Sequence, residues 1–449
     1  MSAQSTNIYA EREVALPPAT RFPRLLPDVG VVPVELGDHV ARHGPVPYRG
    51  APRLLTEEVR ASGLTGRGGA AFPVHRKLTA VADASRAGRT GRGLGASRGP
   101  VVVGNGAEGE PASSKDKSLL WLAPHLVLDG LQLAAEAVGA RTAYLYLHAA
   151  PNGRLRDRLR GALADRVRAG VDRVPVEIAD APPRFLAGQE SALVNRIGGG
   201  PAIPGYTPPR VFERGIGGAP TLVQNVETLA HLALIARHGA AWFRAVGTHD
   251  EPGSMLCTVR QTDGRTDVVE AAIGTPLPVL LGLSGAQAVL AGGYHGAWVP
   301  AAQAPRLSLS NASLRPSGSF LGAGVLAALP ADRCGLAETA RVARYLAVES
   351  AGQCGPCLNG LPRIATALAS LAEPRAAAAQ LADLERWSSL VVRRGACQHP
   401  DGTVRFVRSA LHVFRDEIRQ HERGRCTGTT SRPFLPTGAG TASTDEDWS

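Results

Sequence analysis

The strongest constraint on the fold is an alternation of strand-like and helix-like segments that begins at residue 100. The runs "PVVVG", "TAYLYL" and "VPVEI" are short and rich in β-branched or aromatic residues, as buried strands are. Residues 118–139 and 152–170 lie between these runs and have the apolar spacing of helices. Strands that alternate with helices pair in parallel, so we expect an α/β domain with its ligand site at the carboxyl ends of the strands.

Two polar loops are expected at that edge of the sheet, at residues 104–111 and 185–191. In the first loop Asn105 ends a strand, and Glu108 and Glu110 follow where a carboxylate can bond a polyol or the edge of a heterocycle. An ordinary acidic loop before a serine-capped helix explains the same residues equally well. The residue types alone leave both interpretations open.

A glycine-rich turn at residues 62–78 is the second candidate site. It places three glycines around Arg67, with Phe72 and Lys77 after them. Glycine lets backbone N–H groups approach a phosphate, a basic side chain supplies charge, and an aromatic ring can stack on a ligand. The chain has three lysines among 49 basic residues, which indicates that Lys77 serves a site that needs a compact ammonium group. A glycine turn without a ligand is the alternative.

The cysteines indicate a metal centre and not a disulfide scaffold. Six cysteines in 449 residues are too few for a scaffold, whereas Cys354 and Cys357 form a C-x-x-C motif and Cys397 follows at a distance. Two thiolates from one turn and a remote third can hold an iron–sulfur cluster or a zinc ion. A pair of ordinary buried thiols is the alternative interpretation.

The pattern changes twice further along the chain. A β-rich stretch begins near residue 250, with a turn at Asp263-Gly264, and indicates a small separate domain. From residue 335 apolar residues recur with helical spacing, which fits a helical bundle. Both ends of the chain and a basic loop at residues 84–99 are expected to be flexible.

Composition narrows the class of protein. The chain contains no apolar run of about 18 residues and no signal-peptide core, so we expect a cytoplasmic protein that is not transmembrane. Its net charge of +10 favours an acidic partner. Aromatic residues make up 5% of the chain and the arginines form no stripe, which argues against a nucleic-acid partner.

Together these motifs resemble the flavin-binding, NADH-oxidising subunit of respiratory complex I and its relatives in soluble hydrogenases and formate dehydrogenases. The resemblance runs from about residue 36 to 421 and rests on five blocks in the family order. The blocks are "GRGGAAFP" with Lys77, "NGAEGEP" with "KD", "LAGQESAL", "APTLVQNVETLA", and "ESAGQCGPCLNG" with Cys397. It implies an α/β domain for FMN and a nucleotide, then a ubiquitin-like β-grasp domain, then a helical bundle with an iron–sulfur cluster.

The resemblance also implies domain boundaries and site residues. The domains are a flexible N-terminal segment (1–35), the FMN- and nucleotide-binding α/β domain (36–248), the β-grasp domain (249–333), the iron–sulfur helical bundle (334–425) and a disordered tail (426–449). The residues assigned to FMN or nucleotide binding are Gly66, Arg67, Gly68, Gly69, Phe72, Lys77, Asn105, Glu108, Gly188, Glu190, Gln224 and Asn225. The cluster ligands are Cys354, Cys357 and Cys397, and no residue is assigned to catalysis.

One departure from the family concerns the cluster. Ala351 stands where the family has its first cluster cysteine, so one thiolate is missing. A [4Fe–4S] cluster would then take its fourth ligand from water, an exogenous group, or a side chain such as Ser350 or His399, and a [3Fe–4S] cluster would need none.

Other departures concern the nucleotides. Ala107 and Gln189 replace an aspartate and a glutamate beside the flavin, and Ala80 and Arg210 replace two of the three aromatics that hold NADH, leaving Phe72. An aromatic pair contributes about 0.5–1.5 kcal/mol beyond its buried area, so two losses weaken nicotinamide binding by about one or two orders of magnitude.

The resemblance implies an FMN flavoprotein oxidoreductase. Electrons would enter from NAD(P)H or a reduced carrier and leave through the cluster to a ferredoxin or a thioredoxin-like [2Fe–2S] subunit, with the protein free or at the periphery of a membrane complex. The alternative is a degenerate paralogue that binds a nucleotide or a partner without redox activity. Zinc at the cysteines is a third hypothesis.

Overall fold

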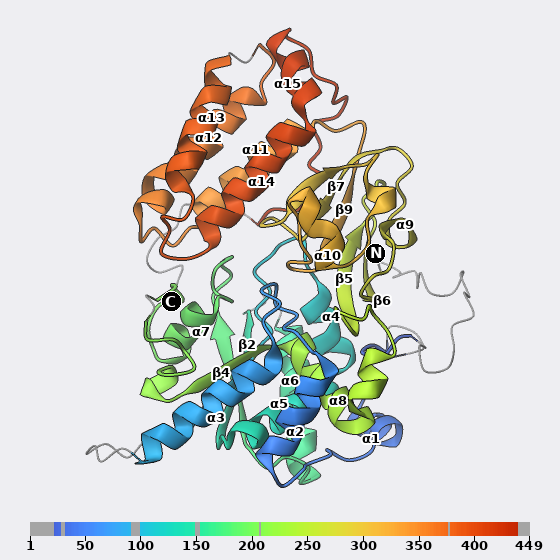
Figure 1. The fold of residues 1–449 in the computed structure, drawn as a ribbon, viewed down its shortest axis with the longest axis vertical. Helices are drawn as coiled ribbons and strands as arrows, with labels where there is room; N and C mark the ends of the chain where they lie inside the picture. The colour runs from blue at the N-terminus through green and yellow to red at the C-terminus, as the bar shows by residue number, and fades with distance from the viewer. Residues whose placement is uncertain are drawn as a thin grey trace.

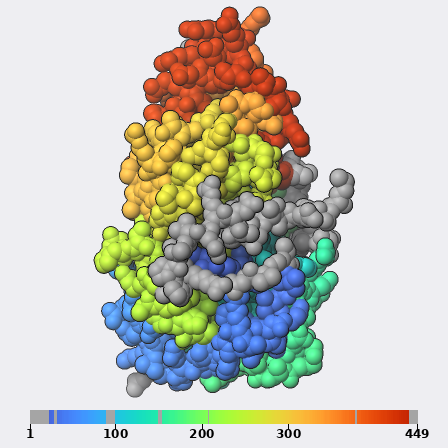
Figure 2. Space-filling model, turned by 90° about the vertical axis from the view of Figure 1, so that its right-hand side faces the viewer, coloured from blue at the N-terminus to red at the C-terminus, as the bar shows by residue number. Residues whose placement is uncertain are grey.

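The structure is a computed structural model that describes residues 22–27, 32–90, 99–148, 153–205, 208–375 and 378–438. An α/β layer, a mixed β-sheet and a group of helices follow one another along its long axis (Figure 1). The space-filling view shows the same order (Figure 2). The parallel sheet and the helical C-terminal region confirm two parts of the expected fold, the α/β domain and the helices that end the chain.

The parallel sheet is built from strands that lie far apart in the sequence. Its strands are β1 Val101–Asn105, β2 Thr142–His148, β3 Val176–Ala181 and β4 Thr221–Asn225. Their order is β3-β2-β1-β4, and β1 pairs in parallel with both β2 and β4. The three expected strands are confirmed, and β4 is a fourth that the periodicity does not predict. The sheet therefore brings the ends of β1 and β4 together.

Helices cover this sheet. They are α1 Leu36–His43, α2 Pro52–Ser62, α3 Val74–Thr90, α4 Lys115–Leu122, α5 Pro124–Val138, α6 Arg154–Arg168, α7 Glu190–Ile197 and α8 Val226–Arg244, with a 3-10 turn η3 at Ile216–Gly218. The single helix expected over 118–139 is two helices that meet at 97°, because Pro124 begins a new helix. The basic loop expected at 84–99 is wrong for residues 84–90, which belong to α3, and residues 91–98 lie outside the described ones.

The bent pair formed by α4 and α5 is strongly apolar. All residues of α5 except Glu136 are buried, and α5 packs against α8. Within the described residues no single helix is long and apolar enough to cross a bilayer, and this bent pair reaches the required length and composition only as two helices together.

The middle sheet has the order β6-β5-β9-β7-β8. Its elements are β5 Ser254–Arg260, β6 Thr266–Ala272, α9 Leu277–Leu280, β7 Ala286–Ala291, β8 Ala297–Pro300, η4 Ala304–Arg306, α10 Asn311–Leu314, η5 Arg315–Ser317 and β9 Val325–Pro330. β5 pairs antiparallel with β6 across the expected turn at Asp263-Gly264 and parallel with β9, and the other pairs are antiparallel. The change to β-rich structure near residue 250 is therefore confirmed.

The C-terminal helices pack as an all-helical group at one end of the molecule (Figure 1). They are α11 Gly335–Val348, the π-helical turn η6 Pro356–Gly360, α12 Leu361–Leu371, α13 Ala378–Val391, α14 His399–Val413 and α15 Arg415–Glu422. The apolar spacing on α12 and α14 is buried in one core, as the periodicity predicts.

The chain after α15 continues along this group. Phe434 and Leu435 are buried, and Glu338 of α11 accepts hydrogen bonds from both of their backbone N–H groups, at 2.8 and 3.0 Å. The disordered tail expected at 426–449 is therefore wrong for residues 426–438, because two buried apolar side chains are enough to hold this largely exposed segment against α11. The rest of the tail lies outside the described residues.

The N-terminal segment is partly described. Within the flexible stretch expected at 1–35, residues 22–27 pack on the middle sheet: Leu25 is buried, and Glu270 of β6 accepts the backbone N–H groups of Arg24 and Leu25 at 2.7 and 2.8 Å. This part differs from the expectation, and most of the remainder lies outside the described residues.

Candidate functional site

Two asparagines mark the carboxyl edge of the parallel sheet. Asn105 and Asn225 end β1 and β4 opposite one another. Asn105 Nδ2 donates to the Gly188 carbonyl at 2.8 Å, and its Oδ1 accepts from the Ala107 N–H at 3.2 Å. Asn225 Oδ1 caps α8 by accepting from the backbone N–H of Glu227 at 3.0 Å. The two polar loops predicted at this edge therefore meet there.

Lys77 reaches the same edge from α3. Its Nζ donates to Glu190 Oε1 at 2.7 Å and to the Val223 carbonyl at 3.3 Å. The Lys77 side chain is 29% exposed and that of Glu190 42%, so the ion pair faces an opening and not the core. A lysine ammonium has three donors, and these two bonds use two of them. The ammonium group thus keeps a donor for an anionic or polar ligand.

Gln224, one residue before the end of β4, carries a buried amide nitrogen without a partner. The residue is 4% exposed, and within the described residues its Nε2 makes no hydrogen bond. A buried donor left unsatisfied costs about 1–3 kcal/mol, so such groups in native proteins need an explanation such as a ligand or a water. This observation fits a ligand that brings acceptor groups to the strand ends.

Glycines shape a cradle around these residues. A Cβ added to Gly188 would lie 2.5 Å from the Ala107 carbonyl oxygen, and one added to Gly68 would lie 3.2 Å from Asn225 Cβ. Gly69 has a φ of +104°, which other residues rarely adopt. Any larger residue would therefore fill or distort the space between the glycine-rich turn and the strand ends.

Arg67 differs from its predicted role as an FMN ligand. Its backbone N–H donates to Thr228 Oγ1 at 2.8 Å, and its guanidinium donates to the Ser254 and Pro252 carbonyls at 3.1 and 3.4 Å. The residue is buried, and burial lowers the pKa of its guanidinium. Arg67 fastens the glycine-rich turn to the start of β5, so Lys77 is left as the basic side chain of this site.

The aromatic part of the turn is exposed. Gly66 closes the turn by donating to the Phe72 carbonyl at 2.9 Å, and the Phe72 side chain is 44% exposed. Ala80 offers no ring, and Arg210 lies on the surface with its N–H bonded to Glu213. Of the three positions considered, Phe72 is thus the one that offers an exposed ring.

Glu108 and Gln189 cap helices. Glu108 accepts from the Ser113 hydroxyl and from the backbone N–H of Asp116 at 3.3 Å, at the start of α4. Gln189 Oε1 accepts from the backbone N–H groups of Ser191 and Ala192 at 2.8 and 3.0 Å, at the start of α7. Helix N-termini carry unsatisfied N–H groups and favour acceptors. Glu108 therefore departs from its prediction as a cofactor ligand, and the alternative of an acidic loop before a helix describes it better.

Glu110, the second carboxylate that the sequence places in the first polar loop, is the most perturbed acid of this loop. Its Oε2 accepts from the Tyr294 N–H at 3.0 Å, and within the described residues its buried Oε1 has no partner. Burial raises the pKa of Glu110 from 4.5 to about 8, and nearby Glu108 adds to the rise. Glu110 is thus a carboxyl that stays protonated at neutral pH where the α/β layer meets the middle sheet.

The raised pKa of Glu110 predicts how the stability of the folded protein changes with pH. The folded protein keeps a proton on Glu110 that the unfolded chain loses near pH 4.5. The free energy of unfolding therefore falls as pH rises from about 4.5 to about 8, by up to about 5 kcal/mol. Glu110→Gln removes that titration, so its melting temperature, measured calorimetrically across this range, should fall less steeply than that of the natural protein. Parallel curves for the two proteins would contradict the assignment.

The three motif cysteines come together between α11, η6 and α14. Cys357 is buried, and Cys354 and Cys397 are half-buried. Burial and then the neighbouring Cys354 thiol raise the pKa of Cys357, to about 12, and also that of Cys397. The Cys354 and Cys357 thiols hydrogen-bond one another, and the charge of Cys397 acts on Cys357. Three thiolates gathered in this way can hold an iron–sulfur cluster or a zinc ion.

The structure separates the two candidate side chains for a fourth ligand. His399 is buried with Nε2 bonded to the Leu346 carbonyl at 2.8 Å and Nδ1 bonded to His295 at 3.0 Å, so both of its nitrogens are engaged. The Ser350 hydroxyl donates a hydrogen bond to the Cys357 sulfur. Of the two, Ser350 is the one directed at the cysteines.

A small aromatic group joins the second polar loop to the segment that carries Cys397. The rings of Phe185 and His295 lie 5.0 Å apart, those of Phe185 and His399 5.6 Å, and those of His295 and His399 5.1 Å. Phe185 belongs to the second polar loop, and His399 begins α14, two residues after Cys397. The sequence gives no local signal for His295, whose partners are distant along the chain.

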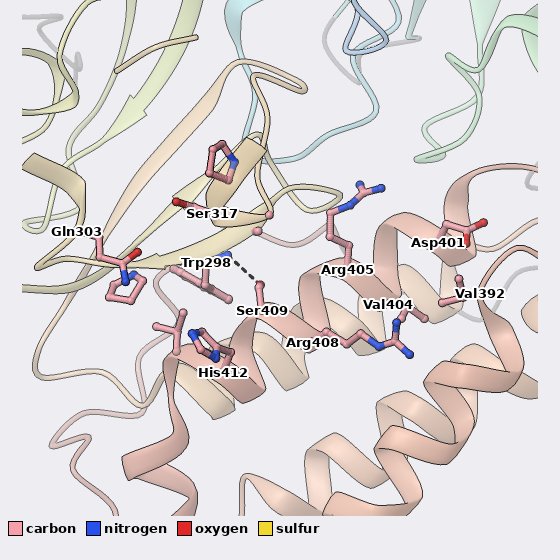
Figure 3. A pocket seen from close by; sticks show the side chains of 15 residues that line it. Trp298, Gln303, Ser317, Val392, Asp401, Val404, Arg405, Arg408, Ser409 and His412 are labelled. Atoms are coloured by element: carbon pink, nitrogen blue, oxygen red, sulfur yellow. Dashed lines mark hydrogen bonds between the residues drawn. The ribbon is translucent and has the colours of Figure 1, made fainter. Parts of the chain in front are cut away.

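A groove lies beside the loop that carries Cys397. It encloses about 610 Å³ between β8 and α14, and its lining includes Trp298, Asp401, Arg405, Arg408 and His412 (Figure 3). Arg405, Arg408 and His412 line one wall together, so this wall of the groove is basic.

Known proteins share this arrangement. A family profile described as the Nuo51 FMN-binding domain matches residues 59–234, and one described as the NADH-ubiquinone oxidoreductase-F iron-sulfur binding region matches residues 337–421. The chain is 30% identical over 384 residues to the NADH-quinone oxidoreductase F subunit of Mycobacterium bovis, a match that covers 82% of this chain and 84% of that protein. It is 29% identical over 397 residues to an NADH-quinone oxidoreductase F-2 subunit of Rhizobium meliloti, covering 84% and 90%.

A solved structure has a similar fold. The crystal structure of an NAD+-reducing [NiFe]-hydrogenase in the H2-reduced state has a TM-score of 0.74 at 29% identity and covers 88% of this chain, which spans 65% of the hydrogenase chain. The fold and sites thus define an oxidoreductase of the NADH dehydrogenase type, with an FMN-binding domain and an iron–sulfur binding region. The chain belongs to the family of NADH-quinone oxidoreductase F subunits, which confirms the resemblance drawn from the sequence blocks.

Proposed function

We propose that the carboxyl edge of the parallel sheet binds FMN through Lys77, Asn105, Gln224 and Asn225, with the glycine-rich turn and Gly188 leaving room for it. The observation that carries this proposal is the unpaired amide of Gln224, the residue that follows the Val223 carbonyl to which the Lys77 ammonium group donates. Bound FMN supplies the exchange between a two-electron donor and one-electron carriers. Lys77 contributes charge and a hydrogen bond, and Glu190 holds its ammonium group in place.

The middle sheet is proposed to be a β-grasp domain. Its order β6-β5-β9-β7-β8, with a parallel pair in the centre between antiparallel hairpins, supports that assignment. The proposed domain boundaries stay those expected from the sequence, except that residues 22–27 and 426–438 belong to the packed structure.

We propose nicotinamide as the electron donor, bound with Phe72 as its stacking ring. Because two further aromatics are missing, its affinity should be about 10- to 100-fold lower than with three rings. Titrating the anaerobic protein with NADH tests this: the flavin absorbance should bleach at high NADH concentrations. Flavin that stays oxidised with NADH but bleaches with a reduced ferredoxin would reverse the direction of electron entry.

An acidic electron-carrier protein, a ferredoxin or a [2Fe–2S] subunit, is the proposed acceptor. The net charge of +10 and the basic wall of the groove beside the Cys397 loop support this partner. Six cysteines in 449 residues are too few for a disulfide scaffold, which supports a reducing, cytoplasmic location.

A cysteine at position 351 should complete the cluster. Ala351 is half-buried beside the core that contains Leu186, and Ser350 now bonds Cys357. We expect Ala351→Cys to raise the iron content from about three to about four per chain and to change the electron spin resonance spectrum toward that of a [4Fe–4S] cluster. Unchanged iron content and spectrum would mean that the fourth ligand already comes from elsewhere.

The alternative is a degenerate paralogue without redox activity. The missing cluster cysteine at Ala351 and the missing aromatics at Ala80 and Arg210 favour this alternative. The unpaired amide of Gln224 and the three gathered cysteines favour a protein that still holds its cofactors.

A further inference from the structure

A second group of metal-binding side chains lies away from the motif cysteines. Cys334, Glu417, His421 and Cys426 each offer one ligand atom, and these atoms all lie within 4.8 Å of one another. Cys334 precedes α11, Glu417 and His421 are one turn apart on α15, and Cys426 follows α15. The first three are buried and Cys426 is exposed. We call this group the C-terminal cluster.

The C-terminal cluster is distinct from the motif cysteines. Cys397 precedes the start of α14, whereas α15 follows its end (Figure 1). At 1.5 Å per residue the 15 residues of α14 span about 22 Å, so the two groups lie at opposite ends of this helix.

His421 is oriented as a metal ligand. Its Nδ1 lies 3.1 Å from the Leu371 carbonyl, which can only accept, so Nδ1 carries the proton and the Nε2 lone pair faces the cluster. A backbone carbonyl in this role is the usual partner of a metal-bound histidine. Nε2 lies 2.9 Å from Glu417 Oε1, and since both atoms are acceptors, a proton or a cation must lie between them.

The spacing of the ligand atoms fits a zinc ion. With bonds of about 2.3 Å to sulfur and about 2.0–2.1 Å to nitrogen, a tetrahedral zinc ion sets sulfur and nitrogen about 3.6 Å apart. The distance from Cys334 Sγ to His421 Nε2 is 3.6 Å. The same geometry sets nitrogen and a carboxylate oxygen about 3.4 Å apart, so Glu417 would move outward by about half an ångström.

Both sulfurs accept hydrogen bonds from backbone N–H groups, although burial raises the pKa of each thiol. The Ala337 N–H donates to Cys334 Sγ at 3.4 Å, and the Gly428 N–H bonds the Cys426 sulfur. A Cβ added to Gly428 would lie 2.7 Å from the Cys334 backbone nitrogen, so the chain after Cys426 is pressed against the start of α11.

We propose that Cys334, Glu417, His421 and Cys426 bind a structural Zn²⁺ ion. Two thiolates, an imidazole and a carboxylate are ligands that zinc accepts in a closed tetrahedral site. The ion joins the start of α11 to α15 and to the segment that carries Phe434 into the core. Binding releases the thiol protons to solvent and involves no redox step.

Zinc and iron counts by mass spectrometry, on protein purified without a metal-affinity step, test the proposal. The natural protein should hold about one zinc per chain. Cys426→Ser should lose it while keeping iron and flavin, and its exposed position keeps the core intact. Cys354→Ser should lose iron and keep zinc. Glu422→Gln, next to His421 on the same helix and exposed, is the matched control and should keep both.

Three results would overturn the proposal. The first is zinc that disappears in Cys354→Ser but not in Cys426→Ser, which places it at the motif cysteines. The second is natural protein without zinc even after growth and dialysis with added Zn²⁺, which leaves a protonated His421 paired with Glu417. The third is a Cys334–Cys426 disulfide in peptide mapping of the freshly prepared protein.

Discussion

Lys77→Ala is expected to leave the protein folded and without flavin. The variant removes a charge-assisted hydrogen bond, worth about 1.5–3 kcal/mol, and leaves Glu190 as an uncompensated negative charge beside a phosphate or ring oxygen. We therefore expect FMN affinity to fall by at least about 10- to 100-fold, so that purified protein is colourless in the flavin bands. Equilibrium dialysis with added FMN measures the difference.

Two other substitutions make this result specific. Lys77→Arg keeps the charge but introduces a planar fork, and it should restore little of the binding because the space between Glu190 and Val223 fits a point donor. Lys117→Ala is the matched control, because Lys117 lies on α4 with its Nζ 3.9 Å from Glu108 Oε2. The Lys117→Ala protein should keep its flavin. Full flavin content in Lys77→Ala would show that the proposed site is misplaced.

Cys354→Ala should lose iron and keep flavin. Cys354 is half-buried, so the substitution leaves little empty space, and its thiol is the one that perturbs both Cys357 and Cys397. With two thiolates left, a cluster has too few ligands to persist. Iron should fall from about three or four per chain to near zero, as an iron assay after anaerobic purification would measure.

The separation of the two cofactors is the informative part of that experiment. The FMN residues belong to the α/β layer and the cysteines to the helical group, so flavin content should match that of the natural protein (Figure 1). Cys426→Ser is the matched cysteine control and should keep its iron. Loss of flavin together with iron would mean that the cluster supports the fold as a whole.

Local pattern was sufficient for much of the fold. The strands β1 to β3 and the turn at Gly264 could be predicted because neighbouring residues determine them. The break at Pro124 is obscured because the apolar period of residues 118–139 continues across it, although proline is a local signal for a new helix. The burial of Phe434 could not be predicted, because it depends on contacts with α11, such as the hydrogen bond to Glu338. The order of the strands in the parallel sheet could not be predicted either, because it depends on pairing between segments far apart in the chain.

The site could be predicted in position but only partly in role. Lys77, Gln224 and the glycines lie where the motifs place them, whereas Arg67 is bound by carbonyls more than 180 residues away and Glu108 caps a helix. The role of Arg67 has no local signature, whereas the role of Glu108 corresponds to the alternative of an acidic loop before a helix. The C-terminal cluster likewise combines Cys334 with α15, across a sequence gap that no short motif spans.

The most direct measurement is the absorbance spectrum of anaerobically purified protein, with FMN and iron counted on the same sample. The account predicts flavin bands at about one FMN per chain together with about three to four irons. A folded protein that is colourless and iron-free, and that takes up neither FMN nor iron with sulfide under reducing conditions, would contradict it and support a subunit that binds partners without redox chemistry.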